Sequence, residues 1–413
     1  MYGGSMGRER EKIVVTGMGA VTPVGCGVEN YWNNLINGEC GIDRIMRFDA
    51  ESLAVKIAGE VKDFDIEAYM PKKMIHETDA FTQYAFAAAK EALGEELPAD
   101  PERTGIVMGT AMAGVATTAA TQEILTNAVH KNVGPRFVPR ILGNIAAAQI
   151  AISYGIYGPS STLSTACASG CDAVSMAAMI LLADEADAVL AVGSESVLCP
   201  LVIYSLANAH TLSRMNDDPL HACRLFDTAR NGFVIGEGGG ALVLERESHA
   251  KARGAEIYAE LAGWANNNDA YHVMQPDPDG KMAARCMQMA MDCAGVAAQQ
   301  IDHINAHGTG TKQGDSAELA AISQVFGDAR PAITSTKGAT GHLMGGGGLT
   351  ESIACIQAIR TGIIPPTLNL DDPEGDFDYV AGQMRRQHVE TAMTNAFGFG
   401  GQNASLIFRR YEG

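Results

Sequence analysis

The chain alternates short apolar, β-branched runs with longer stretches of helical periodicity, and this alternation restricts its possible folds most strongly. Buried strands are predicted where the runs are short: at 13–19, 104–109, 187–193, 240–245, 257–262, 301–306, 332–335 and 404–409. Helices are predicted at 78–93, 144–154, 168–183, 281–294, 315–326 and 348–361. Strands that alternate with helices indicate an α/β fold whose sheets are covered by helices.

The alternation contains a weak internal repeat. The segments 13–22 and 257–263 each open a part of the chain with an apolar strand, and each part then carries reactive residues on a turn between strand and helix. We therefore expect two similar halves, 11–255 and 256–413, that share a central site. Residues 1–10 are interpreted as a tag or disordered start.

Composition and charge argue against several classes of protein. Hydrophobic residues make up 46% of the 413 residues and charged residues 19%, which is typical of a compact enzyme rather than a disordered chain. The net charge of −18 argues against nucleic acid or an anionic membrane as the main partner. No apolar run approaches the roughly 20 residues of a membrane span. The 9 cysteines are scattered without a CxxC pair, so we expect free thiols in a reducing cytoplasm.

Cys167 differs from the other cysteines in its surroundings. It lies in a run of small residues, 164–170, between a strand-like segment and a helix predicted to begin at Ala168. A thiol at a helix N-terminus faces free backbone N–H groups and the positive end of the dipole, which favour the thiolate and an oxyanion. We predict that Cys167 is a nucleophile that forms an acyl-enzyme. Cys171 is expected to be a packing residue, and no metal site is predicted.

Two further glycine-rich turns carry side chains suited to serve this thiol. His307 ends an apolar strand, and Lys337 and His342 lie on a turn that follows another strand. Histidines in such turns are more often catalytic than structural. Lys337 could itself be a nucleophile, but with Glu318 it is expected to set the charge and orientation of the histidines. Asp315 could be a plain helix cap.

A set of motifs, in this order and spacing, resembles the condensing enzymes, specifically the β-ketoacyl-[acyl carrier protein] synthase II family of fatty acid synthesis. The resemblance runs from about residue 12 to residue 409. The motifs are VTGMGAVTPVG at 15–25, TACASG at 165–170, RNGFVIGEGGGALVLE at 230–245, DAYH at 269–272, NAHGTGT at 305–311, STKGATGH at 335–342, PPTLNLD at 365–371 and NAFGFGG at 395–401.

The resemblance implies a thiolase-like fold of two similar halves in five alternating layers, αβαβα, and a homodimer. It implies that an acyl group moves from the phosphopantetheine of an acyl carrier protein to Cys167. Malonyl-carrier would then lose CO₂, and its carbanion would attack the acyl-cysteine to give a β-ketoacyl-carrier. The phosphopantetheine belongs to the carrier, so no cofactor is expected on the enzyme.

The resemblance also implies roles for the site residues. His307 and His342 would stabilise the enolate as neutral donors, with Lys337 and Glu318 as their charged support. The backbone N–H groups of Cys167 and Phe399 would form the oxyanion hole, and Phe399 would act as a gate between the half-reactions.

Substrate contacts follow from the same motifs. Thr309 and Thr311 match residues that bind the pantetheine arm, Gly400 lies in the glycine-rich flap, and Met112 falls deep in the expected acyl pocket.

The sequence departs from the family pattern near the expected carrier surface. The candidate docking residues are Lys72, Lys73, Arg136 and Arg140. Glu77 would oppose an acidic carrier, and Met274 and Gln402 replace expected polar groups.

These departures leave several alternatives open. The chain could be a specialised polyketide or polyene ketosynthase with a dedicated carrier, or one subunit of a ketosynthase heterodimer. A non-catalytic subunit would lack the cysteine, and a thiolase would carry a second catalytic cysteine after Cys355, where none occurs. A simple thiol hydrolase has no local His–Asp pair to support it.

Overall fold

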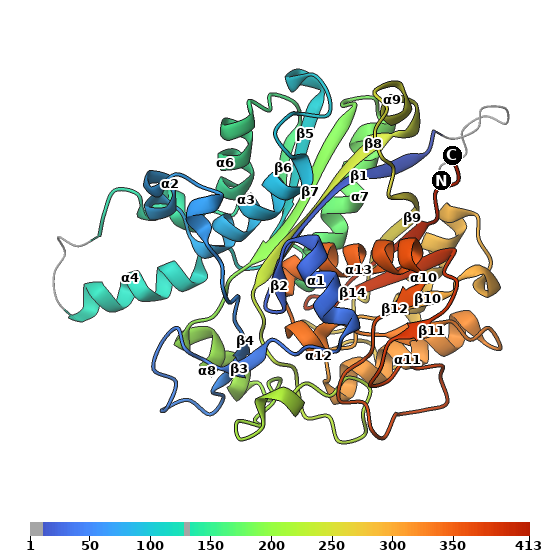
Figure 1. Ribbon diagram of the computed structural model, residues 1–413. Helices are drawn as coiled ribbons and strands as arrows, with labels where there is room; N and C mark the ends of the chain where they lie inside the picture. Colours follow the sequence, from blue (N-terminus) through green and yellow to red (C-terminus); the bar gives the residue numbers. More distant parts are fainter. Residues whose placement is uncertain (1–10, 128–132) are drawn as a thin grey trace.

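The computed structural model describes residues 11–127 and 133–413, so the predicted start at 1–10 lies outside the described residues. Its core is a mixed sheet of 11 strands, drawn as arrows in Figure 1. The main strands are β1 (Ile13–Thr22), β5 (Thr104–Gly109), β6 (Ser160–Leu163), β7 (Ala188–Glu195), β8 (Gly238–Arg246), β9 (Ala259–Asn268), β10 (His303–Asn305), β11 (Ala332–Thr334), β14 (Thr391–Gly398) and β15 (Gln402–Arg409).

Helices surround and divide this sheet. They are α1 (Val28–Ile36), α2 (Lys72–Glu77), α3 (Ala80–Leu93), α4 (Val115–Asn127), α5 (Phe137–Ile141), α6 (Ile145–Tyr154), α7 (Ser169–Leu182), α8 (Pro200–Asn208), α9 (Glu247–Ala252), α10 (Lys281–Ala294), α11 (Lys312–Phe326), α12 (Lys337–Thr340) and α13 (Gly347–Thr361). Short strands complete the architecture: β2 (Gly25–Cys26), β3 (Ile42–Arg44), β4 (Ile57–Gly59), β12 (Ile363–Ile364) and β13 (Arg385–Arg386).

The sheet consists of two blocks with the same strand order. The first block runs β6-β5-β7-β8-β1 and the second β11-β10-β14-β15-β9. In each block the first three strands are parallel and the remaining pairings are antiparallel. The blocks join where β1 pairs with β9. Two similar halves are therefore present, as the internal repeat predicts. We retain the division at 255/256, between α9 and β9, as a proposal.

The helices complete five layers. α7 and α13 lie between the two strand blocks, where α7 packs against β5 and β7 and α13 packs against β14 and β8. α3 and α6 cover the outer face of the first block, and α10 with α11 covers that of the second. This is the αβαβα architecture of a thiolase-like fold.

The two central helices approach closely because glycine occupies their contact. A Cβ atom at Gly348 of α13 would lie 2.6 Å from the backbone nitrogen of Cys171 on α7. Any larger residue would push the helices apart. Cys171 is buried at this contact, so it packs the core.

The repeated topology places functional turns together. In parallel strands the carboxyl ends share one edge of the sheet. The turns after β6 and β11 are counterparts in the two halves; one carries Cys167 and the other carries Lys337 and His342. The turns after β5 and β10 are likewise counterparts, carrying Met112 and His307. Along the described parts of the chain, no helix has the length and apolarity required to span a membrane.

Candidate active site

Most of the predicted site residues line one cavity of about 950 Å³ between the two halves. Those that line it are Met112, Cys167, His307, Thr309, Thr311, Glu318, His342 and Phe399. Lys337 is buried outside the lining, Gly400 is exposed and does not line the cavity, and the four docking candidates lie elsewhere. The cavity therefore brings together side chains from both halves of the chain.

Cys167 lies on a tightly held turn between β6 and α7. A 3₁₀ turn, Ala166–Ala168, precedes α7, which begins at Ser169, one residue after the predicted start. Ala166 has φ 51°, a left-handed conformation that is costly for a residue with a side chain. Ser169 holds the turn, because its Oγ accepts from the Thr165 N–H at 2.9 Å and donates to the Ala166 carbonyl at 2.6 Å. The thiol thus lies at the N-terminus of α7.

The two histidines lie next to this thiol. The Nε2 atom of His342 is 3.0 Å from the Cys167 sulfur, and the ring centroids of His307 and His342 are 5.4 Å apart. Burial lowers the pKa of both histidines well below the usual value, and the nearby Lys337 charge lowers it further. Both imidazoles are therefore neutral at pH 7, so each has one N–H donor and one lone pair.

The same three residues have the spacing of metal ligands. One ligand atom from each of Cys167, His307 and His342 lies within 4.8 Å of the others. A thiolate and two imidazoles would suit Zn²⁺. The same set also suits acyl transfer, which needs a nucleophile, a proton acceptor and a hydrogen-bond donor.

The protonation of Cys167 differs from the sequence-based expectation. The helix N-terminus predicts a thiolate, but burial has the larger effect and raises the pKa of the thiol to about 12. The positive charge of Lys337 and the Phe399 backbone N–H oppose this rise. At rest the thiol keeps its proton, so a base must accept it during attack.

Lys337 forms a buried ion pair that the sequence did not predict. Its Nζ is 2.5 Å from Oε1 of Glu351 on α13, and the two side chains are 2% and 4% exposed. The prediction joined Lys337 with Glu318. The signal for Glu351 was that it is the one acidic residue of the largely buried helix Gly347–Thr361.

Glu318 instead holds the turn that carries His307. Its two carboxylate oxygens accept the backbone N–H groups of His307 at 2.8 Å and Gly308 at 2.7 Å. Burial raises the pKa of Glu318 to about 7, against the effect of these two bonds. Glu318 therefore positions His307 through the backbone.

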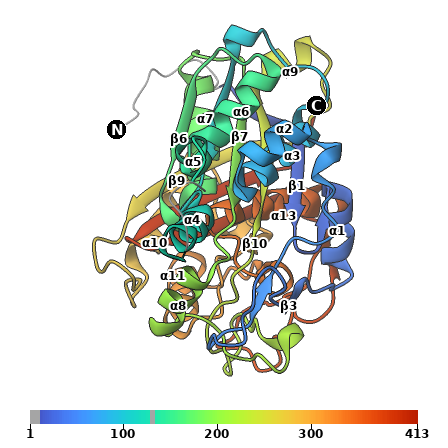
Figure 2. The same cartoon turned by 90° about the vertical axis from the view of Figure 1, so that its left-hand side faces the viewer.

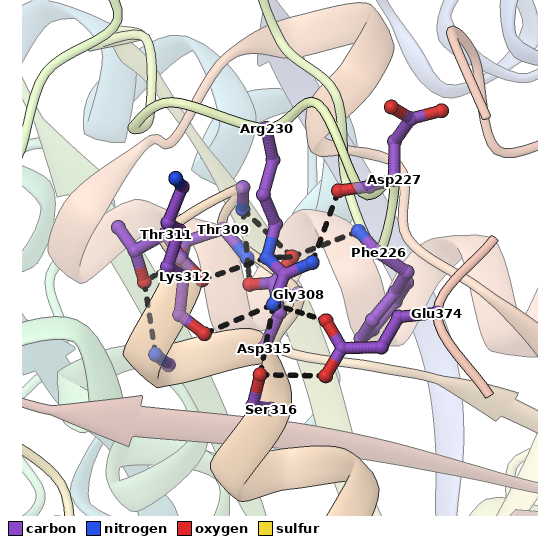
Figure 3. Close-up of polar contacts among 12 residues, drawn as sticks. Phe226, Asp227, Arg230, Gly308, Thr309, Thr311, Lys312, Asp315, Ser316 and Glu374 are labelled. Carbon is purple, nitrogen blue, oxygen red and sulfur yellow. Dashed lines mark hydrogen bonds and ion pairs between the residues drawn. The ribbon is translucent and has the colours of Figure 1, made fainter. Parts of the chain in front are cut away.

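Asp315 extends this support along the same turn, as Figure 3 shows. Its carboxylate accepts the N–H groups of Thr309 at 2.9 Å, Gly310 at 3.0 Å and Phe226 at 2.8 Å. The Arg230 Nε lies 3.8 Å from the carboxylate. The suggestion that Asp315 caps a helix is wrong, because its oxygens bind the preceding turn.

Arg230 links the turn to two neighbouring segments. Its guanidinium donates to the carbonyls of Thr311 at 3.2 Å and Lys312 at 3.0 Å, and pairs with Glu374 (Figure 3). Thr311 is the true N-cap of α11, since its Oγ1 accepts the Gly314 N–H. The Oγ1 atoms of Thr309 and Thr311 are 3.1 Å apart, at the cavity wall.

The turn after β14 closes the other side of the cavity. Phe399 is 39% exposed, and the next residues, Gly400 and Gly401, have φ 83° and 74°. Glycine adopts this left-handed conformation without strain. Gly400 contacts neighbouring loops through Val273 and Asn268 and does not line the cavity. Met274, where the resemblance expects a threonine, lines it.

The candidate docking cations on α2 differ in their pairing. Lys72 pairs with Glu67 at 3.2 Å, at a highly exposed position. Lys73 makes no ion pair with any residue in 11–127 or 133–413. It is therefore the freer of the two lysines.

The two candidate arginines lie against acidic residues. Arg136 pairs with Glu77 at 2.9 Å, so Glu77 neutralises a docking candidate. Burial raises the pKa of Asp79, and Arg140 is among the groups that oppose this rise. Carrier docking on this side would rely on few uncompensated charges.

Comparisons with known proteins agree with this fold. Family models for the N-terminal and C-terminal domains of β-ketoacyl synthases match residues 10–250 and 258–371. The chain is 41% identical to 3-oxoacyl-[acyl-carrier-protein] synthase 2 of Synechocystis sp. over 98% of this chain and 99% of the relative. It is 40% identical to the Vibrio harveyi protein of the same name, over 97% and 99%.

Solved structures give the same result. The ishigamide ketosynthase/chain length factor matches with TM-score 0.90 and 33% identity, over 98% of this chain and 100% of that one. A β-ketoacyl synthase from Burkholderia phymatum matches with TM-score 0.90 and 33% identity, over 97% and 100%. Fold and site together define an acyltransferase of the condensing-enzyme class. The chain belongs to the β-ketoacyl synthase family.

Proposed function

We propose that this enzyme condenses a cysteine-bound acyl group with malonyl-acyl carrier protein and so extends fatty acids. The observation that carries the proposal is the neutral His342 Nε2 placed 3.0 Å from the Cys167 sulfur, with His307 beside it in a cavity. The names of the full-length relatives support the same reaction.

In the first half-reaction, the Cys167 sulfur attacks the acyl thioester while its proton passes to the lone pair of His342. The developing oxyanion lies against the N–H groups of Cys167 and Phe399. The C–S bond to the carrier then breaks, and the leaving pantetheine sulfur takes the proton. Cys167 keeps the acyl group, and His342 returns to its neutral form.

In the second half-reaction, the malonyl thioester carbonyl accepts an N–H group from His307. The bond to the carboxylate breaks, CO₂ leaves, and its electron pair forms the enolate. The enolate carbon attacks the acyl carbonyl, and Cys167 leaves as a thiolate, which takes up a proton from water to restore the resting thiol. The Lys337 charge favours both anions, since it opposes the rise in the thiol pKa.

The substrate would arrive on a carrier protein, whose phosphopantetheine arm reaches the cavity past Thr309 and Thr311. The proposed docking groups are Lys72, Lys73, Arg136 and Arg140. The proposed cofactor requirement is limited to that arm. Free cysteines throughout the described chain support a reducing, cytoplasmic location.

We also propose a homodimer built on the edge strand β6. This strand ends the first block, and Figure 2 shows it grouped with α4, α5 and α6. Ile152 is 75% exposed and Tyr157 76% exposed on this side, together with Val138. An open strand edge with apolar neighbours favours pairing with a second copy.

A second candidate is a specialised ketosynthase with its own carrier. The pairing of Arg136 with Glu77 favours it, because it weakens a general attraction to acidic carriers. One structural neighbour is a polyketide ketosynthase solved with its acyl-carrier protein, "AntDE:AntF (apo)", at TM-score 0.88. Cys167 argues against a non-catalytic subunit.

Two substitutions of the nucleophile test the proposal. Cys167→Ala should yield no acyl-enzyme by mass spectrometry and no β-ketoacyl product. Cys167→Gln, which mimics an acylated site, should still release CO₂ from malonyl-carrier. Condensation by the alanine variant would refute the mechanism. A survey of which carriers and chain lengths acylate the parent Cys167 decides between the two candidates.

A further inference from the structure

The turn after β5 has a buried carboxylate of its own. This turn, residues 110–112, is the counterpart of the His307 turn in the other half. Glu318 accepts two backbone N–H groups of the His307 turn. Glu195, the last residue of β7, does the same for residues 110–112. In each half, a buried glutamate therefore holds a turn of the cavity wall by accepting its backbone N–H groups.

The contacts of Glu195 tie two walls together. Its Oε1 accepts from the Thr110 hydroxyl and the Met112 N–H, each at 3.1 Å. Its Oε2 accepts the N–H of Ala111 at 2.5 Å and of Gly345 at 3.3 Å. Gly345 lies three residues after His342, so the same carboxylate contacts the acyl-pocket turn and the histidine turn.

The acyl-pocket turn and the histidine turn pack closely where Ala111 meets Gly345. A Cβ atom at Gly345 would lie 2.7 Å from the Ala111 nitrogen and 2.9 Å from Oε2 of Glu195. On the opposite side, the Ser164 hydroxyl donates to the Ala111 carbonyl at 3.2 Å. Ser164 lies three residues before Cys167. The pocket wall is thus fixed to both the nucleophile turn and the histidine turn.

Glu195 is fully buried and forms no ion pair within 11–127 and 133–413. A tie of this kind could be made by an uncharged residue at lower desolvation cost. Burial raises the pKa of Glu195 to about 7, and the hydrogen bonds from the four donors oppose this rise.

We infer that Glu195 is a positioning and specificity-determining residue, which fixes the Met112 wall of the acyl pocket relative to the turns that carry Cys167 and His342. The inference deepens the proposed function and rests on it for the nature of the acyl substrate. Met112 and Ala111 both line the cavity, so a shift of their turn changes the space open to the acyl chain.

The test compares Glu195→Gln with Glu195→Asp. The amide keeps one acceptor but places an NH₂ group against backbone donors and removes the charge. The shorter carboxylate keeps the charge but cannot reach all four donors. Acyl-carriers of increasing chain length are offered to each variant, and transfer to Cys167 is followed by mass spectrometry. Both variants should change the long-to-short ratio of kcat/KM by about tenfold.

Reactivity of the thiol gives a second readout of the wall position. Alkylation of Cys167 by iodoacetamide and by a long-chain iodoacetamide is read on its own peptide at one pH, and the ratio of the two rates should change in both Glu195 variants, because Ala111, Met112 and Cys167 line the same cavity. Because it needs no carrier, this readout stands if the proposed substrate is wrong. If Glu195→Gln does not fold, the long-to-short ratio of kcat/KM in Glu195→Asp still tests the positioning role.

A matched control is Glu91→Gln. Glu91 on α3 also accepts two backbone N–H groups, from Ala20 at 2.9 Å and Val28 at 2.7 Å, and it does not line the cavity. The Glu91→Gln variant should have the same chain-length ratio and the same alkylation of Cys167 as the parent. Unchanged ratios in both Glu195 variants, or an equal shift in the Glu91 variant, would overturn the inference. Failure of the parent enzyme to accept any carrier-bound acyl group would instead count against the proposed function.

Discussion

Two buried carboxylates support the two histidine turns, and they are stabilised in different ways. Glu351 pairs with Lys337 at 2.5 Å, so one buried charge compensates another. Glu318 accepts two backbone N–H groups and makes no ion pair within the described residues. The first arrangement supplies a cation beside Cys167, and the second fixes the position of His307. Glu351 thus stabilises the charge of Lys337, and Glu318 stabilises the position of His307.

The largest expected effect comes from removing the cation. Lys337→Met leaves Glu351 buried without its partner, which should lower the free energy of unfolding by about 3–5 kcal/mol. Condensation should be lost as well, because the positive charge near the anions is gone. Urea unfolding and product formation measure the two effects.

The double variant Lys337→Met/Glu351→Leu distinguishes charge from packing. Replacing both members of a buried pair by apolar residues is often neutral. It should therefore recover most of the lost stability while remaining inactive. A double variant as unstable as the single one would show that the ion pair is not the reason for the loss.

A smaller effect is expected when geometry alone is disturbed. Glu318→Gln loses one of two acceptors, which should cost about 1–3 kcal/mol of stability. A displaced His307 should slow malonyl decarboxylation by up to about 10²-fold. Acylation of Cys167 should fall less, since His342 is not held by Glu318. Equal losses in CO₂ release and acyl-enzyme formation would contradict separate roles.

The smallest effect is expected at Asp315. Its carboxylate accepts backbone N–H groups and also lies 3.8 Å from the Arg230 Nε, so two kinds of contact stabilise it. Burial raises its pKa from 3.8 to about 6, so the native state binds the proton more tightly than the unfolded state. The stability of the parent relative to Asp315→Asn should therefore fall as pH rises from about 4 to 6. Urea titrations across this range measure the difference. If the stability of the parent relative to Asp315→Asn instead rises with pH, the effect of Arg230 on the Asp315 pKa is larger than that of burial.

The fold and the reactive residues could be predicted because their signals are local. Strand and helix periods reveal the α/β order, and small residues around Cys167 mark a turn that presents a thiol. The two histidines follow strands in the same manner. Each of these features lies within about a dozen neighbouring residues, so spacing alone carries the information.

The supporting acids were harder to predict, because their partners are distant in the chain. Glu195 accepts from residues 84 and 150 positions away, and only the folded sheet brings them together. The pairing of Lys337 with Glu351 was not predicted, since α13 and α11 both carry a buried glutamate. The thiol pKa also depends on total burial, which a helix start cannot indicate.

The division of the site between two halves has a consequence for synthesis. The first half, with Cys167, leaves the ribosome before His307, Lys337 and His342 exist. Domains form largely in order as the chain emerges. A nascent first half therefore carries a thiol without its proton acceptor or its cation. Acyl transfer begins only when β9 has paired with β1 and the second half has closed over the first.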